Sequence, residues 1–313
     1  GVGERGGAMQ FAPGTRMNGV AAISNDGKLA AGGTMAGEIY LWDIAGSASV
    51  SPKMIGTPTP VIVGGTAVTT AVFSADGHSV FAASADDNSH QVVMVDHSDR
   101  SRVRVVESLD AGDLVQLLAV SPNGRLLAAA TASGVVVWDI SAGPGKIRRT
   151  AQLSGFESLV STVRFSPDSK TLAAGSDDKT ARLWDVEDPT TPIELAHLTG
   201  PSGAIQSLTF NWAGTHLAGG IGSHQIWVWD VTDRTAPTRV AALNANVDRV
   251  NDVAYGPSDT DMTAASLDGV LRTWATDPET VATALCADSA AIITESEWSQ
   301  YLPDTAYRHP CAE

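Results

Sequence analysis

Basic residues are scarce in this chain. Its 313 residues include 20 lysines and arginines against 35 aspartates and glutamates, which gives a formal net charge of −15. Binding to nucleic acid or to an anionic membrane surface requires clustered cations that displace counterions. We therefore expect no nucleic-acid partner. The 43% hydrophobic content is too high for a disordered chain, so the composition predicts a packed globular protein with an acidic surface.

The motifs of several enzyme and metal-site classes are also missing. The chain contains no G-x-x-x-x-G-K-[ST] phosphate loop, no H-E-x-x-H zinc motif and no G-x-S-x-G nucleophile turn. The seven histidines are scattered, and the acidic clusters at 86–88 and 259–261 lack the twelve-residue spacing of a calcium loop. We read those clusters as turns. We expect no catalytic residue, cofactor or metal site, and a role that is not enzymatic.

No hydrophobic run fits a membrane span. The longest uncharged run, residues 54–75, contains Pro58, Pro60 and the pair Gly64-Gly65. This pattern predicts two strands joined by a turn, and so no membrane insertion within this chain. No signal peptide is visible, and the sequence begins with Gly1 instead of Met, so we expect the native start to lie upstream.

The most regular feature of the chain is a repeated segment, clearest at residues 166–185 (SPDSKTLAAGSDDKTARLWD). It reads as a turn, a strand of small apolar residues, a polar turn and a strand ending in Trp-Asp. The Trp place recurs at positions 42, 95, 138, 184, 229 and 274, in steps of 53, 43, 46, 45 and 45 residues, with Val95 in place of Trp in the second copy. A period of about 40–45 with this ending is typical of a four-stranded propeller blade. The repeat residues are Trp42, Asp43, Asp96, Trp138, Asp139, Trp184, Asp185, Trp229, Asp230 and Trp274.

These six copies resemble the WD40-repeat family and cover roughly residues 1–276. The resemblance implies an all-β fold, a WD40-type β-propeller. Small apolar residues suit blades that are buried on both faces, Trp rings can fill the space between blades, and each Asp can accept hydrogen bonds in the next turn. We therefore expect the repeat residues to be structural. Six repeats predict six blades, or seven if the tail or an upstream piece adds one, and residues 1–16 are expected to supply an outer strand near 8–11.

The repeat pattern stops after Trp274, and we expect residues 277–313 to form a short C-terminal extension, helical or irregular, packed on the propeller. Its order of Asp277-Pro278, Glu297-Trp298 and Tyr301-Leu302-Pro303 resembles the end of large actinobacterial WD40 proteins. In those proteins a STAND-type ATPase or a Ser/Thr kinase precedes the repeats, often with a transmembrane helix between them. The resemblance implies that this chain is the sensor or scaffold domain of a larger signalling protein.

Both cysteines, Cys286 and Cys311, lie in this extension. Two short helices that fold back would bring them together, and a disulfide closing such a loop would stabilise the fold by ~3 kcal/mol. Two free thiols are the alternative. A disulfide would imply an oxidising compartment, and the membrane topology of the resembling proteins points the same way. We favour the extracytoplasmic face of the cell envelope, with a membrane-tethered parent protein, and keep the cytoplasm as the alternative.

WD40 proteins usually bind partners on the face formed by the loops that lead into the innermost strands and by the turns between the second and third strands. Phe156 stands where the family often has His, so its ring is either an exposed anchor or packing beneath a loop. We expect a non-enzymatic platform for a protein or peptide. The alternatives are a hydrolase or lyase with its site at the central channel, and a cap that keeps an N-terminal effector domain inactive. The residues expected on the binding face are Phe156, Glu157, Asp178, His224, Asp248 and Arg249.

Overall fold

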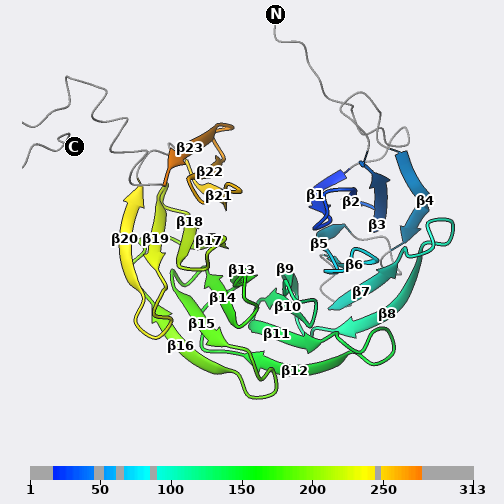
Figure 1. Cartoon of the computed structure of the whole chain (residues 1–313), viewed down its shortest axis with the longest axis horizontal. Coiled ribbons are helices and arrows are strands. Elements are labelled where there is room, and N and C mark those ends of the chain that lie inside the picture. The colour runs from blue at the N-terminus through cyan, green and yellow to red at the C-terminus, as the bar shows by residue number, and fades with distance from the viewer. Residues whose placement is uncertain (1–16, 46–52, 61–66, 85–89, 244–247, 277–313) are drawn as a thin grey trace, which may run out of the picture.

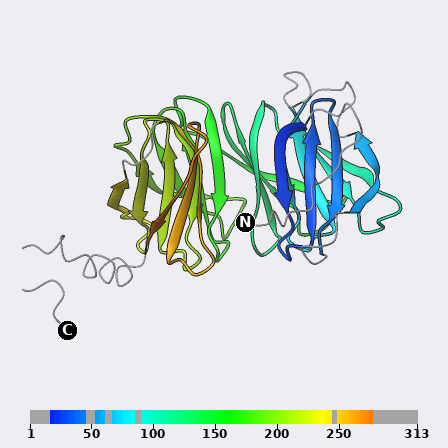
Figure 2. The same ribbon diagram turned by 90° about the horizontal axis from the view of Figure 1, so that it is seen from above.

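The computed structural model describes residues 17–45, 53–60, 67–84, 90–243 and 248–276. These residues form 23 strands and no helix, arranged in six antiparallel sheets. Figure 1 shows the sheets following one another around an arc that is open between the sixth sheet and the first. Figure 2 shows the same arc from above, with the strands of each sheet side by side and the connecting turns gathered at two opposite edges.

Each sheet is made of consecutive strands, in sequence order across the sheet. The first contains β1 (Met17–Ile23), β2 (Leu29–Thr34), β3 (Glu38–Asp43) and β4 (Lys53–Pro60). The second contains β5 (Val68–Phe73), β6 (Ser79–Ser84), β7 (Gln91–Asp96) and β8 (Arg104–Asp110). The third contains β9 (Val115–Val120), β10 (Leu126–Thr131), β11 (Gly134–Asp139) and β12 (Arg148–Leu153).

The fourth sheet contains β13 (Val160–Phe165), β14 (Thr171–Ser176), β15 (Ala181–Asp185) and β16 (Ile193–Leu198). The fifth contains β17 (Ile205–Phe210), β18 (His216–Ile221), β19 (Ile226–Asp230) and β20 (Thr238–Leu243). The sixth has three strands in the described residues: β21 (Val250–Tyr255), β22 (Asp261–Ser266) and β23 (Leu271–Ala275). The all-β architecture and the assignment of one sheet to each repeat are confirmed.

The first strand of every sheet lies on the concave side of the arc, and in sheets one to five the fourth strand lies on the outside (Figure 1). The innermost strands β1, β5, β9, β13, β17 and β21 pack against one another in that order. A sheet inside the arc therefore has a neighbour against each face. This explains why β10 and β14 are buried along their whole length, where a strand with one solvated face would alternate.

Small residues in the second strands let neighbouring sheets approach closely. Gly175 in β14 shows the constraint: a Cβ there would lie 2.6 Å from Ile205 Cγ2 of the fifth sheet, inside van der Waals contact. Trp184, at the end of the third strand, is 3% exposed and belongs to an apolar cluster with Leu126 and Val137 of the third sheet. The fourth sheet is thus close-packed on both faces, with Gly175 against the fifth sheet and the Trp184 ring against the third.

A buried serine closes the turn that follows the innermost strand. Ser166 Oγ donates to Asp168 and accepts a hydrogen bond from the Thr171 amide at 2.9 Å, while Asp168 Oδ1 accepts from the Lys170 amide at 3.1 Å. In the first sheet, hydrogen bonds from Ser24 and Lys28 lower the pKa of Asp26 to about 2. The Ser-x-Asp pattern of the repeat is therefore a hairpin closure in which the polar groups satisfy one another.

The aspartate after the repeated Trp accepts a hydrogen bond in the turn that follows. Asp139, Asp185 and Asp230 each accept a hydrogen bond, at 2.8–3.0 Å, from the amide two residues further on. The predicted extension at 277–313, with Cys286 and Cys311, and the strand predicted near residues 8–11 lie outside the described residues. None of the described segments is helical, so none of them offers a helix long and apolar enough to cross a membrane.

Candidate binding face

One edge of the arc carries both the loops that lead into the innermost strands and the turns between the second and third strands. Backbone hydrogen bonds join loop and turn in the fourth, fifth and sixth sheets. The Asp177 amide donates to Leu159 O at 2.9 Å, the Gly222 amide to Ala204 O at 2.8 Å, and the Leu267 amide to Arg249 O at 3.0 Å. We call this surface on the fourth to sixth sheets the loop face: residues 154–159, 177–179, 199–204, 222–224, 248–249 and 267–269.

All six residues expected at a partner site lie on the loop face. Glu157, in the loop before β13, and Asp178, in the turn between β14 and β15, are in contact: the Glu157 amide donates to Asp178 Oδ2 at 2.9 Å. Asp248 and Arg249 are neighbours on the sixth sheet, and Asp248 Oδ1 accepts from the Arg249 amide at 2.6 Å. His224 is exposed in the fifth-sheet turn, at a positive φ of 72°. These contacts concern position only, and binding by the six residues stays a prediction.

The ring of Phe156 is half-buried and held from two sides. Its centroid lies 5.8 Å from that of Trp184, and the guanidinium carbon of Arg182 lies 5.4 Å from the centroid. Such a cation–ring contact is worth about 0.5–1 kcal/mol at an exposed site. Arg182 also donates to Gly155 O and to Glu194 Oε1, at 2.7 Å each. Phe156 is therefore a packed residue of the loop face, held by Trp184 and Arg182, and remains partly exposed to solvent.

Asp178 is held as a fixed anion. Thr180 donates to Asp178 Oδ1 through both its amide, at 2.8 Å, and its hydroxyl, at 2.7 Å. Partial burial tends to raise the pKa of Asp178, but the hydrogen bonds from Thr180 and from the Glu157 amide outweigh that effect and lower it. The carboxylate is therefore charged at neutral pH and has little rotational freedom.

A polar network connects the fourth and fifth sheets below the loop face. Asp177 Oδ1 accepts from Ser161 Oγ at 2.7 Å and from Gln206 Nε2 at 3.2 Å. Ser161 and Gln206 are each the second residue of an innermost strand, where the neighbouring sheets have Gln116 and Asn251. These residues were not among those predicted from the sequence. The signal that could have found them is a polar residue at the second place of four successive innermost strands.

Acidic side chains outnumber basic ones on the loop face. Lys179 and Arg249 are its basic residues, and the acidic ones are Glu157, Asp177, Asp178, Asp248 and Asp268. In the part of the chain that the structure describes, no group of three or more His, Cys, Asp or Glu side chains is placed to hold a metal ion. The loop face therefore presents carboxylates, backbone amides and the aromatic ring of Phe156 to a partner.

Residues 147–185 match the family described as WD domain, G-beta repeat. The match begins one residue before the outer strand β12 and ends at the last residue of β15, so it contains the segment in which the repeat is clearest. Together with six antiparallel sheets of three or four strands, it identifies the fold as a WD40-type β-propeller.

Curated WD-repeat proteins share parts of the sequence. The chain is 29% identical over 167 residues to WD repeat-containing protein SL1-17 of Schistosoma mansoni, covering 53% of this chain and 50% of that protein. It is 34% identical over 89 residues to the Protein LST8 homolog of Drosophila pseudoobscura pseudoobscura, covering 27% and 28%. It is 33% identical over 116 residues to apoptotic protease-activating factor 1 of Danio rerio, covering 37% and 8%. The matched segments span half or less of each relative.

Proposed function

We propose that this WD40-type propeller is a non-catalytic platform that binds a protein or peptide on its loop face. Similarity to WD-repeat proteins such as SL1-17 and the LST8 homologue supports a role in protein–protein interaction. Fold alone does not specify a partner, so we infer binding from the loop face itself.

The observation that carries the proposal is the tethering of the loop face in the free protein. Asp178 binds the Glu157 amide, and Asp177 connects two sheets through Ser161 and Gln206. A surface that is already ordered loses little conformational entropy when a partner binds. The excess of carboxylates favours a partner segment that carries lysine or arginine, since complementary charge steers association and disfavours acidic competitors.

We further propose that the chain is the sensor or scaffold part of a larger signalling protein in which a STAND-type ATPase or a kinase precedes the repeats. The resemblance of the residues after Trp274 supports this assignment. So does the match to apoptotic protease-activating factor 1, which covers 8% of that protein, because it places a similar segment within a far longer chain. The division into a propeller at 1–276 and an extension at 277–313, with a Cys286–Cys311 disulfide, belongs to this proposal.

Charge reversal tests the loop face. The double variant Glu157→Lys/Asp248→Lys changes two exposed side chains of the face. The matched control, Glu187→Lys/Asp233→Lys, makes the same charge change in exposed linkers at the opposite edge of the arc. Tagged wild-type chain and both variants are used for quantitative affinity capture from cells of the source organism, after their melting curves have been compared.

The expected result is at least one protein that the wild type and the control retain equally and that the loop-face variant retains about tenfold less, the size of a 1.4 kcal/mol loss. Equal retention of every captured protein by all three chains would contradict binding at the loop face.

A further inference from the structure

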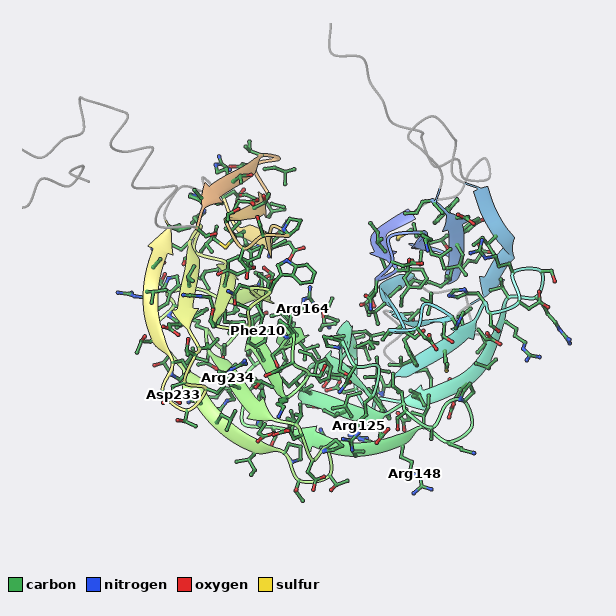
Figure 3. The ribbon with its side chains drawn as sticks, viewed as in Figure 1. Arg125, Arg148, Arg164, Phe210, Asp233 and Arg234 are labelled. Atoms are coloured by element: carbon green, nitrogen blue, oxygen red, sulfur yellow. The ribbon has the colours of Figure 1, made fainter. Side chains whose placement is uncertain are left out.

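A pocket lies at the edge opposite the loop face. It has a volume of about 420 Å³, within the range of small-ligand sites. Its walls come from the ends of β13, β17 and β21 and from the turns that follow β9, β13 and β17. Figure 3 shows two of its residues, Arg164 and Phe210, on the concave side of the arc. We call it the Arg164 pocket.

Arg164 is the one charged residue among those that line this pocket. Its guanidinium donates to the backbone oxygen of the adjacent Val163 at 3.1 Å. Among the described residues, no carboxylate oxygen lies within 4.0 Å of it to form an ion pair. Burial lowers the pKa of Arg164, and the charge of Asp252 on β21 acts in the opposite direction from a longer distance. A half-buried cation without an ion-pair partner is costly to desolvate, and an anion in the pocket would offset that cost.

Aromatic residues line the same pocket. The indole of Trp212 belongs to a residue that is 65% exposed, yet its turn is fixed, since the Trp212 and Ala213 amides donate to the Asp259 carboxylate at 2.7 and 3.0 Å. Burial, aided by the charge of Asp259, raises the pKa of Tyr255, so its hydroxyl stays protonated and can donate a hydrogen bond. Phe210 adds an apolar ring, which the Arg234 guanidinium also contacts, with its carbon 5.4 Å from the ring centroid.

We propose that the Arg164 pocket binds an oxyanion, a carboxylate or a phosphate, carried on an aromatic or apolar body. Arg164 would take the anion through charge-assisted hydrogen bonds, with the Tyr255 hydroxyl as a neutral donor. The rings of Trp212 and Phe210 would contact the apolar body. This site is separate from the loop face and does not depend on the function proposed for that face.

The test uses three probes on the full chain: phenyl phosphate, N-acetyl-L-phenylalanine and the neutral N-acetyl-L-phenylalaninamide. Binding is followed by ligand-observed saturation-transfer NMR and by tryptophan fluorescence. We expect saturable binding of at least one of the anions and at least tenfold weaker binding of the neutral amide. A preference for the phosphate or for the carboxylate identifies the source of the oxyanion.

Variants assign the binding to the pocket. Arg164→Gln is expected to weaken binding of the anion at least tenfold, and Arg164→Lys less. The matched control Arg148→Gln removes an exposed guanidinium on the outside of the arc and should leave binding unchanged (Figure 3). Trp212→Ala removes an exposed side chain, so the fold should survive while binding weakens.

Three results would each overturn the proposal. The first is no saturable binding of either anion up to 10-millimolar concentrations, about the weak limit of specific binding. The second is equal affinity for the amide and the acid, and the third is wild-type affinity for the anion in Arg164→Gln. If Arg164→Gln does not fold, Trp212→Ala and Arg164→Lys test the assignment instead. Unchanged anion affinity in both variants would contradict binding in the Arg164 pocket.

Discussion

The fourth and sixth sheets come from copies of one repeat, yet their second strands differ in burial. Every residue of β14 is buried, whereas in β22 buried and half-buried residues alternate. The fourth sheet lies between two sheets, and the described residues place a sheet against only one side of the sixth (Figure 1). The strand pattern therefore reports on the neighbours of a sheet as much as on its own sequence.

The third strands repeat the contrast. Trp184 is 3% exposed, whereas Trp274, at the same place in the sixth repeat, is half-buried. Leu271, the first residue of β23, is 71% exposed, while Ala181, at the same place in β15, is fully buried. Apolar residues at equivalent places in these two sheets therefore differ in burial, and we expect their contributions to stability to differ accordingly. The first sheet, at the other end of the arc, does not share this exposure, since β2 is buried along its whole length and Trp42 is 2% exposed.

Truncating the two tryptophans should give the largest difference. Trp184→Ala removes a ring buried between two sheets and is expected to cost about 3–5 kcal/mol of the free energy of unfolding. Trp274→Ala should cost clearly less, because part of that ring is already in contact with water. Urea denaturation of both variants measures the difference. Equal losses would show that the sixth sheet is covered as fully as the fourth.

A matched pair in the second strands should give the next largest effect. Gly175→Ala places a Cβ 2.6 Å from Ile205, so we expect a loss of about 1–3 kcal/mol through overpacking. The equivalent position in the sixth sheet already carries a side chain, Ala265, and is half-buried. Ala265→Val should change stability by less than about 0.5 kcal/mol, as expected for a surface site. The melting temperatures of the two variants test this order, and a larger loss from Ala265→Val would reverse it.

The smallest expected effect is on the pH dependence of stability, through His97, which follows the last residue of β7 in the second sheet. His97 is buried, with its ring edge-on to Phe73 at 5.7 Å, and burial lowers its pKa. The unfolded chain binds a proton at this residue near pH 6.5 and the folded chain only at lower pH, so its contribution to stability is complete above pH 6.5 and is lost as the pH falls.

His97→Phe should therefore melt with less dependence on pH between 7 and 5 than the wild type. The carboxylates with lowered pKa titrate below this window, since their ordinary value is 3.8. His224→Phe, at an exposed site, is the control and should keep the wild-type dependence. Identical pH profiles for all three proteins would rule out a buried neutral His97.

Much of this fold could be predicted from the sequence, because the repeated Trp-Asp and Ser-x-Asp patterns mark the ends of strands directly. The half-covered sixth sheet could not be predicted, because Leu271 and Ala181 are both apolar residues at the same place in the repeat, and only the placement of the neighbouring sheets shows that Leu271 is exposed. The position of the loop-face residues could also be predicted, because their place within the repeat fixes which turn or loop they occupy. Arg164 and Gln206 were overlooked, because each lies in an innermost strand that alternates polar and apolar residues and was assigned to the core as a whole.

The central claim is that the loop face is already ordered in the free protein. Amide hydrogen exchange, resolved by residue, tests it most directly at Glu157 and Asp177, whose amides bind Asp178 and Leu159 O. The account predicts that both amides exchange much more slowly than in an unfolded chain, and that Asp178→Ala selectively accelerates Glu157. Exchange of both amides at the unfolded rate would contradict a preformed binding face.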